Sequence, residues 1–341
     1  MEAACNFIIK NLLRIPRFFS QFRLYGFNVA FWTLLFPFNR LFFNNRLKIA
    51  AHKHVAILKY LSNCYNNILI KYKNIINVSN SFLESDATIW VCWWDGENNM
   101  PPIVKSCYNS IVINAASHPV VLITKYNYFN YISIPEKILN KVNSGIITIT
   151  HFSNILRANL IYEYGGIWLD STILVLNKIV LNDLSFFTLK APAKKSVSVT
   201  INYFLDSSYR KEPHFKNETE ISYWSGFLLA GVKQSFIFAY LREILHAYWN
   251  EHNNQIDYLL FDYLIALGYQ NIPAMKHAID NVPCIEYEKF ELEKALNKEY
   301  NEKIFKEFKL STFHKLTWKK RFSITTNNNK NTLYAYLLSN Y

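Results

Sequence analysis

The sequence predicts an α/β domain with a largely parallel central sheet, extended by helices at its N-terminal and C-terminal ends. Three observations point to this class. Short β-rich runs alternate with helical segments from Ala87 to Leu176, as they do in chains that build parallel sheets. Half of the residues are hydrophobic, which excludes a disordered chain. With 341 residues, the chain is long enough for one large domain and additional elements.

Net charge and cysteine content narrow the range of partners and sites. The 37 basic and 25 acidic residues give a net charge of +12, which favours anionic partners such as lipid headgroups, nucleic acids or phosphorylated substrates. The five cysteines are scattered without a CxxC pair, so we predict neither a disulfide framework nor a zinc site. A reducing, cytoplasmic location is the simplest expectation.

The N-terminal region, residues 1–80, is expected to be helical, basic and rich in aromatic residues. Its segment Ile8 to Phe43 combines Phe and Trp with five Lys or Arg residues. The longest uncharged run is shorter than the roughly 20 residues of a spanning helix, and Pro37 interrupts it. No small-residue cleavage site follows, so a signal peptide is not expected. Two structures stay open: a helix in an anionic membrane interface, on the inner face of the plasma membrane, or a helix packed on its own domain.

The elements of the α/β region follow from residue patterns. The predicted strands, in chain order, are ATIWVCWW, HPVVLIT, IITIT and IWL. The predicted helices between them are IVKSCYNSIVINA, PEKILNKVNSG and HFSNILRANLIYEYGG. We expect Ser153 to cap the last helix and Gly165 to end it, so that a Gly-Gly turn aims the IWL strand toward Asp170.

The second half of the chain has a less regular pattern. A strand is predicted in YWSGFLLAG, and helices are predicted in SFIFAYLREILHAYW, IDYLLFDYLIALG and the charged segment YEKFELEKALNKEYNEKIFKEF. TTNNNKN is a predicted linker before a last helix. We therefore place the main domain at residues 81–325 and a C-terminal tail at residues 326–341.

Two carboxylates are predicted to follow strands, at the edge where parallel sheets bind ligands. These are Asp95 and Asp170. Asp170 could hold a divalent cation, but one Asp is a poor metal site, and it could equally cap the next element. A tryptophan of WVCWWDG could stack on a nucleobase, although tryptophans in strands are more often part of the core.

Two further candidates lie in the C-terminal half. His314 and Lys315 could bind a metal and phosphates, but a basic run of this kind is usually a solvated face. Asp257 and Asp262 are five residues apart, a rotation of roughly 140° on a helix, so they cannot act as a pair. Asp257 is the better placed for a cleft, and an Asp there also fits ordinary helix capping.

Six segments in this order resemble the capsular polysaccharide synthesis proteins. They are IWVCWWDGENNMPPIVKSCYNSI, VVLITKYNYFNYI, FSNILRANLIYEYGGIWLDSTIL, YWSGFLLA, DYLLFDYLI and FHKLTWK. That family is similar to the DXD-containing sugar transferases of glycosyltransferase family 32. The resemblance covers Asp86 to Lys320. It implies a GT-A fold and a glycosyltransferase that uses a nucleotide-sugar donor, with UDP expected, and a glycan or lipid-linked glycan acceptor. No nucleic acid partner is expected, because the basic residues are spread along the chain.

The resemblance also implies roles for individual residues. The implied catalytic residue is Asp170. Asp257, selected above from its position at a helix start, is the second catalytic candidate, and whether it serves as a base depends on the stereochemistry of transfer. The implied ligands of Mn²⁺ or Mg²⁺ are Asp170, Thr172 and His314, although Thr172 stands where the family pattern has a second Asp, and a hydroxyl is a weaker ligand. Metal dependence is therefore open. The implied donor-binding residues are Trp93, which would stack on the base, Asn154, Arg157, Gly166, Trp224, Ser225, Gly226 and Lys315.

Two other functions remain compatible with the sequence. Thr172 would suit a nucleotide- or glycan-binding protein of the same fold that has lost catalysis. The positive charge would suit a polyanion-binding protein, but the chain has no RNA- or DNA-binding motif.

Overall fold

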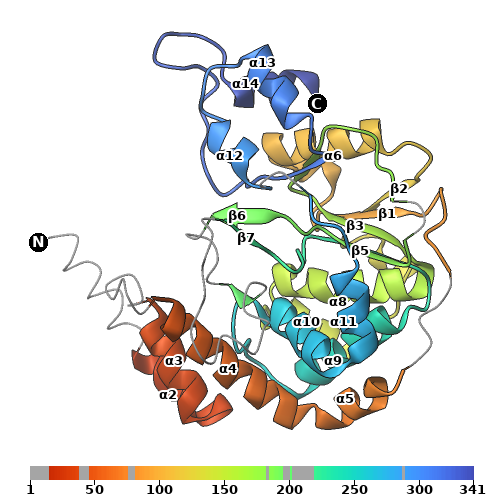
Figure 1. Ribbon diagram of the computed structural model, residues 1–341, viewed down its shortest axis with the longest axis vertical. Coiled ribbons are helices and arrows are strands. Elements are labelled where there is room, and N and C mark those ends of the chain that lie inside the picture. The colour runs from red at the N-terminus through yellow and green to blue at the C-terminus, as the bar shows by residue number, and fades with distance from the viewer. Residues whose placement is uncertain are drawn as a thin grey trace, which may run out of the picture.

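The computed structural model describes residues 15–37, 46–75, 81–181, 184–194, 200–201, 219–285 and 289–341. Its centre is a five-stranded sheet with the order β2-β1-β3-β8-β5 (Figure 1). The strands are β1 (Ile89–Cys92), β2 (Val120–Ile123), β3 (Gly166–Asp170), β5 (Phe186–Thr188) and β8 (Leu228–Gly231). β1 pairs in parallel with both β2 and β3, whereas β8 runs antiparallel to β3 and β5. The predicted α/β class with a largely parallel sheet is confirmed.

Helices cover the sheet on both sides. In Figure 1, α6 lies above the sheet, and α8 and the helices that follow β8 lie below it. The bounds are α6 (Pro102–Asn114), α7 (Glu136–Asn143), α8 (Ile149–Tyr164), α9 (Phe236–Glu251), α10 (Leu260–Asn271) and α11 (Pro273–Asp280). The N-terminal helices α2 (Ile15–Tyr25), α3 (Phe27–Leu35), α4 (Arg46–Cys64) and α5 (Asn66–Lys73) lie at the bottom of the molecule, where α4 and α5 contact α9 and α10.

The C-terminal helices form a second core at the opposite end. They are α12 (Glu291–Ala295), α13 (Glu302–Phe308) and α14 (Leu333–Asn340) (Figure 1). Leu292, Leu333 and Leu337 are buried together with Val104 of α6 and Leu174. The segment predicted as a tail, residues 326–341, is therefore in part a packed element, because its last helix completes this core.

Two small two-stranded sheets lie outside the central sheet. They pair β4 (Ile173–Val175) with β9 (Phe313–Lys315) and β6 (Pro192–Lys194) with β7 (Thr219–Ile221). The pairing of β4 with β9 brings Lys315 close to the turn that follows β3.

Three local predictions were wrong. α8 begins at Ile149 with Thr148 as its N-cap, whose hydroxyl accepts the His151 N–H, so Ser153 lies inside the helix and IITIT is not a strand. The charged segment near residue 300 forms the two short helices α12 and α13 instead of one, because the Asn301 side chain caps a new helix by accepting the Ile304 N–H at 3.1 Å.

The described part of the N-terminal region consists of separate helices. α2 and α3 are divided at Gly26, which has φ +83°. Residues 8–14 and 38–43 of the predicted basic aromatic segment lie outside the described residues. Among the helices that the structure describes, none combines the length and the apolar character that a bilayer crossing requires.

The predicted Gly-Gly turn between α8 and β3 is confirmed. Gly165 and Gly166 have φ +71° and +107°, which side chains rarely tolerate. The backbone is also crowded there: a Cβ on Gly166 would lie 2.3 Å from the Thr88 carbonyl oxygen and 2.8 Å from Trp90 Nε1. The turn therefore lets β3 leave α8 and pair directly with β1.

Gly166→Ala is expected to lower the free energy of unfolding by about 3 kcal/mol, because it combines left-handed strain with a clash against backbone. Gly145→Ala is the matched control, since Gly145 has φ +74° but open space around a Cβ, and it should cost only about 1 kcal/mol. Urea unfolding measures both. Equal losses would show that the close approach to Thr88 contributes nothing.

Candidate active site

Asp170 lies at the point of the sheet where the chain changes direction. After β1 the chain adds β2 on one side, and it then crosses to add β3 on the other side of β1. In the parallel register Cys92 pairs with Asp170, so the carboxyl ends of β1 and β3 are adjacent. The Asp170 N–H donates to the Phe227 carbonyl oxygen at 2.9 Å, which brings the segment before β8 to the same point. Open α/β sheets bind ligands at such switch points.

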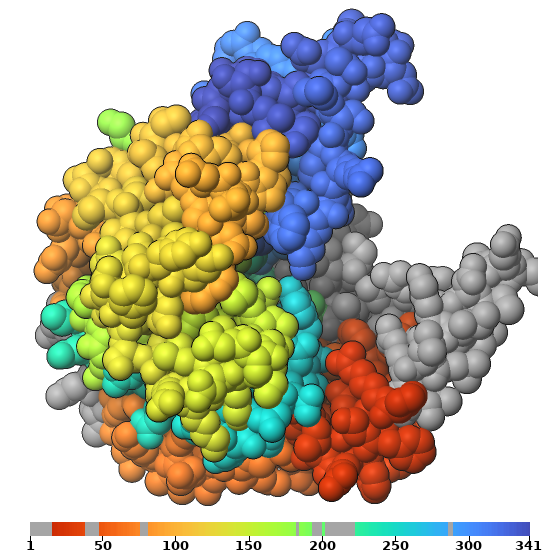
Figure 2. Space-filling view, turned by 180° about the vertical axis from the view of Figure 1, so that it is seen from behind, coloured from red at the N-terminus to blue at the C-terminus, as the bar shows by residue number. Residues whose placement is uncertain are grey.

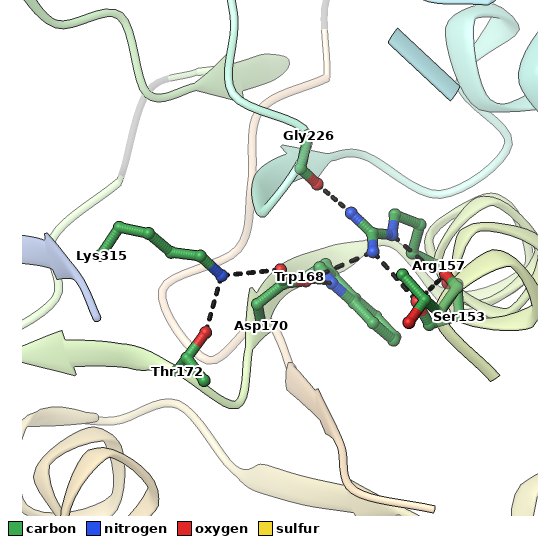
Figure 3. A network of polar contacts seen from close by, with 8 residues as sticks. Ser153, Arg157, Trp168, Asp170, Thr172, Gly226 and Lys315 are labelled. Carbon is green, nitrogen blue, oxygen red and sulfur yellow. Dashed lines mark hydrogen bonds and ion pairs between the residues drawn. The ribbon is translucent and has the colours of Figure 1, made fainter. Parts of the chain in front are cut away.

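Three donors hold the Asp170 carboxylate (Figure 3). Trp168 Nε1 and Arg157 Nη2 contact Oδ1 at 3.0 and 3.3 Å, and Lys315 Nζ contacts Oδ2 at 3.0 Å. Burial alone would raise the pKa of this carboxyl group, but the charges of Lys315 and Arg157 outweigh burial and lower it. Asp170 is therefore a carboxylate at neutral pH, with a side chain that is 29% exposed.

Arg157 supports Asp170 from the buried side of the site. Its guanidinium donates to the Gly226 carbonyl oxygen, to the Ser153 carbonyl oxygen at 3.3 Å and to Ser153 Oγ at 3.2 Å (Figure 3). Burial lowers its pKa, and the charge of Asp170 opposes that shift. Because its side chain is only 6% exposed, Arg157 positions Asp170 and the Gly226 backbone and has little surface left for a ligand.

Lys315 is the cation on the open side of Asp170. The pairing of β9 with β4 sets Lys315 opposite Ile173, so its Nζ lies 3.0 Å from Asp170 Oδ2 and 2.7 Å from Thr172 Oγ1 (Figure 3). An ammonium group has three N–H donors, and these two contacts use two of them. The side chain is 18% exposed. Lys315 can therefore donate its third N–H to a bound anion.

The described residues do not fit a divalent cation at this place. Lys315 Nζ already bridges Asp170 and Thr172, the two residues implied as metal ligands. His314, the third, lies on the other side of β9 because successive strand residues alternate. Its Nε2 lies 2.9 and 3.2 Å from two backbone carbonyl oxygens, and burial lowers its pKa to about 4. The described part of the chain contains no group of three His, Cys, Asp or Glu side chains that could hold a metal.

Trp93 lies beside the site and forms an aromatic pair. It directly follows Cys92, the last residue of β1. Its Nε1 donates to the Asn99 carbonyl oxygen at 3.1 Å, and its ring meets that of Trp318 edge to face at 5.8 Å. Trp93 is half-buried and Trp318 is 47% exposed. The pair leaves ring surface accessible at the edge of the site, where the sequence predicted base stacking.

Other residues implied in donor binding lie where a ligand cannot reach their side chains. Trp224 and Ser225 are buried, and Asn154 is 9% exposed on α8. Only Gly226 of the Trp224-Ser225-Gly226 segment is half-buried. Gly166 begins β3, so it lies roughly 13 Å from Asp170 at the other end of the strand. The resemblance implied that these residues contact the donor. Most of them are instead packed in the structure that supports the site.

With this geometry established, comparison with known proteins identifies the family. A family model described as capsular polysaccharide synthesis protein matches residues 39–337. The chain belongs to this family. The match covers most of the chain and includes the elements that build the site, from Trp93 to Lys315, so the resemblance predicted from six segments is confirmed. No curated protein matches the chain.

In this member of the family, the carboxylate of α10 that lies near Gly226 is Asp262, whereas Asp257, which the sequence favoured, pairs with a lysine of α4. Asp257 Oδ2 pairs with Lys53 Nζ of α4 at 2.7 Å. Asp262 Oδ1 accepts the Trp224 Nε1–H at 2.9 Å and lies under Gly226. Burial raises the pKa of Asp262, although the hydrogen bond from Trp224 opposes the shift.

Lys289, which no sequence pattern singled out, contacts the segment that contains Ser222 and Ser225. Its Nζ lies 2.6 Å from Ser225 Oγ and 3.0 Å from Ser222 Oγ, and its carbonyl oxygen accepts the Lys315 N–H at 2.8 Å. Both Lys289 and Lys315 also face the ring of Phe227, at 5.3 and 5.0 Å from its centroid. Lys289 belongs to a charged segment whose pattern suggested a solvated helix, so its burial was not predictable from local sequence.

Proposed function

We propose that this member of the capsular polysaccharide synthesis family is a glycosyltransferase. It moves a sugar from a nucleotide-sugar donor to a growing capsular or other cell-surface polysaccharide, and its acceptor is a glycan or a lipid-linked glycan. The observation that carries the proposal is the Lys315 ammonium, which Asp170 and Thr172 hold at the switch point with one donor left for an anion. The family match supports the same role.

The chemistry of sugar transfer suits this arrangement. The bond between the anomeric carbon and the diphosphate oxygen breaks, and its electron pair leaves with the nucleotide diphosphate. The acceptor oxygen forms the new bond to the anomeric carbon and releases its proton to solvent water. Negative charge therefore grows on the diphosphate in the transition state, where a cation that is already held in place is most effective. Lys315 supplies that charge, Asp170 orients Lys315, and Arg157 orients Asp170.

We further propose that Lys315 neutralises the diphosphate, the role for which Mn²⁺ or Mg²⁺ was expected. A divalent cation between Asp170 and Thr172 would have to displace the ammonium group, and it would gain only one carboxylate there. An ammonium group neutralises phosphate oxygens without metal ligands, as lysines do in many phosphate sites. The Thr172 hydroxyl then serves as an acceptor for Lys315, which explains how this position functions without a second Asp.

Trp93 and Trp318 provide the proposed platform for the nucleotide base, expected to be uracil. Trp93→Ala should weaken nucleotide binding by about tenfold or more, because base stacking on an aromatic ring contributes roughly 1–3 kcal/mol. Trp32→Ala is the matched control, since Trp32 is a partly buried tryptophan on the distant helix α3. Calorimetry with UDP and GDP measures both variants.

The activity itself is tested by nucleotide release from a panel of UDP- and GDP-sugars. Slow hydrolysis of one donor by the wild-type protein is the expected result, and faster release with a capsular acceptor would support transfer. Nucleotide binding without turnover on any donor or acceptor would instead indicate the catalytically inactive binding protein. Absence of both binding and turnover would contradict the glycosyltransferase proposal.

A further inference from the structure

Helix α2 exposes phenylalanine side chains and packs on the domain through Gln21 and Tyr25. Globular proteins normally bury the apolar side of a surface helix. Here Gln21 and Tyr25 face inward: Gln21 Nε2 donates to the Ile256 carbonyl oxygen at 3.3 Å, and the Tyr25 hydroxyl donates to the Asn254 carbonyl oxygen at 2.6 Å. Phe19 and Phe22 are 62% and 48% exposed. The helix is thus anchored through Gln21 and Tyr25, while Phe19 and Phe22 remain largely exposed.

The exposed rings continue from α2 onto α3 as one cluster. Phe22 meets Phe27 edge to face at 6.4 Å, and Phe27 stacks on Phe31 at 5.5 Å. Phe27 is 56% exposed, and Leu24 is 39% exposed on the same helix pair. Figure 2 shows these helices, in red, at a corner of the molecule away from α12–α14. Single exposed apolar residues are common on proteins, but a continuous group of aromatic rings marks an interaction surface.

The positive charge of the chain is concentrated in the same region. Residues 1–83 contain eleven Lys or Arg and a single acidic residue, Glu2, which is a net charge of +10. The remaining 258 residues contain 26 basic and 24 acidic residues, a net charge of only +2. Basic residues therefore occur along the whole chain, but the net positive charge lies almost entirely in residues 1–83. On α2 itself, Arg17 and Arg23 are exposed beside the rings, and α2 and α3 contain no Asp or Glu.

We propose that α2 and α3 form a docking surface for an anionic lipid bilayer. The rings of Phe19, Phe22 and Phe27 would enter the boundary between headgroups and acyl chains, and Arg17 and Arg23 would contact lipid phosphates. Aromatic residues bordered by arginine, without carboxylates, are the composition that interfacial helices use. The sequence left two alternatives open, a helix in a membrane interface and a helix packed on its own domain. In this arrangement both hold, because α2 packs on its own domain through one face and presents the other to the membrane. The inference does not depend on the proposed activity.

The test is sedimentation of the full chain with lipid vesicles. We expect binding to phosphatidylcholine vesicles that contain about one third phosphatidylglycerol, weak binding to pure phosphatidylcholine, and weaker binding at high salt. Exchanging Phe19 and Phe22 for Ser together should reduce partition by about tenfold or more, and the same exchange of Arg17 and Arg23 should have a similar effect. The matched control exchanges Val180 and Leu310, which are 67% and 65% exposed elsewhere, and should change nothing.

Because all these side chains are exposed, far-ultraviolet circular dichroism and thermal unfolding should be unchanged in every variant. Three outcomes would overturn the proposal. One is equal vesicle binding by the Phe19 and Phe22 variant and the control. Another is tight binding to single-stranded nucleic acid with none to anionic vesicles. The third is a wild-type dimer that the Phe19 and Phe22 exchange dissociates, which would assign this surface to a second copy of the chain.

Discussion

Asp170→Asn should lower the free energy of unfolding by about 2–3 kcal/mol at neutral pH. Removing one partner of a fully buried ion pair costs about 3–5 kcal/mol, because the other charge stays buried without compensation. Here the unpaired charge is Arg157, which is 6% exposed, while the 29% exposure of Asp170 reduces the expected cost. Asn keeps the shape of the side chain and an acceptor for Trp168 Nε1. The decrease in the free energy of unfolding therefore measures mainly the loss of the negative charge of Asp170.

The pH dependence of this loss provides an internal check. The pKa of Asp170 is lowered in the folded protein, so its stabilising effect is complete above the ordinary carboxyl pKa of 3.8 and disappears as pH falls through the folded value. The difference between wild type and Asp170→Asn in urea unfolding should shrink in that acid range. Asp95→Asn is the control, because Asp95 pairs with Lys125 at 2.9 Å with both side chains exposed, and its loss of stability should be much smaller than that of Asp170→Asn. Equal losses for the two variants would contradict the buried pair.

Lys315→Met should reduce nucleotide release from the accepted donor by about 10²–10³-fold, because removal of one preorganised electrostatic group at a developing charge has an effect of this size. The loss should fall mainly on the rate constant and less on donor affinity, since Lys315 acts on charge that grows in the transition state. Met retains the length of the side chain, and Asp170 keeps Arg157 as a partner. We therefore expect at most about 1 kcal/mol of lost stability.

Lys320→Met is the matched control for this experiment. Lys320 is five residues away, 66% exposed and paired with Glu293, so its removal should leave turnover unchanged. Lys315→Arg should retain part of the rate, since it keeps the charge but replaces a compact ammonium group with a planar one. Full turnover in Lys315→Met would exclude Lys315 from the reaction.

Local patterns predicted the backbone of the site correctly. The alternation of strands and helices, the Gly165-Gly166 turn and the position of Asp170 at the end of a strand all depend on short-range features such as periodicity and glycine conformation. Lys315 was also selected from the sequence, through the family resemblance. Its bridge between Asp170 and Thr172 was not, since that contact depends on the long-range pairing of β4 with β9.

Long-range packing sets the surroundings of three predicted site residues, Asp257, Trp224 and His314. Asp257 precedes α10, but Lys53 of α4 neutralises it, and no local signal joins residues that are about 200 positions apart. Trp224 was expected to face a sugar, yet it is buried against Asp262. His314 adjoins Lys315 in sequence and faces away from it because strand residues alternate. In each case the sequence did not predict the direction of the side chain, which depends on neighbours from distant segments.

We propose that a lysine takes the place of a metal at the switch point. Nucleotide release from the accepted donor should be measured with protein stripped of metal by EDTA, and then during titration with Mn²⁺ and Mg²⁺. Release at the wild-type rate in EDTA, without stimulation by either cation, is the predicted result. Loss of release in EDTA and its recovery with Mn²⁺ would contradict the claim, because the cation would then have to displace the Lys315 ammonium from Asp170 and Thr172.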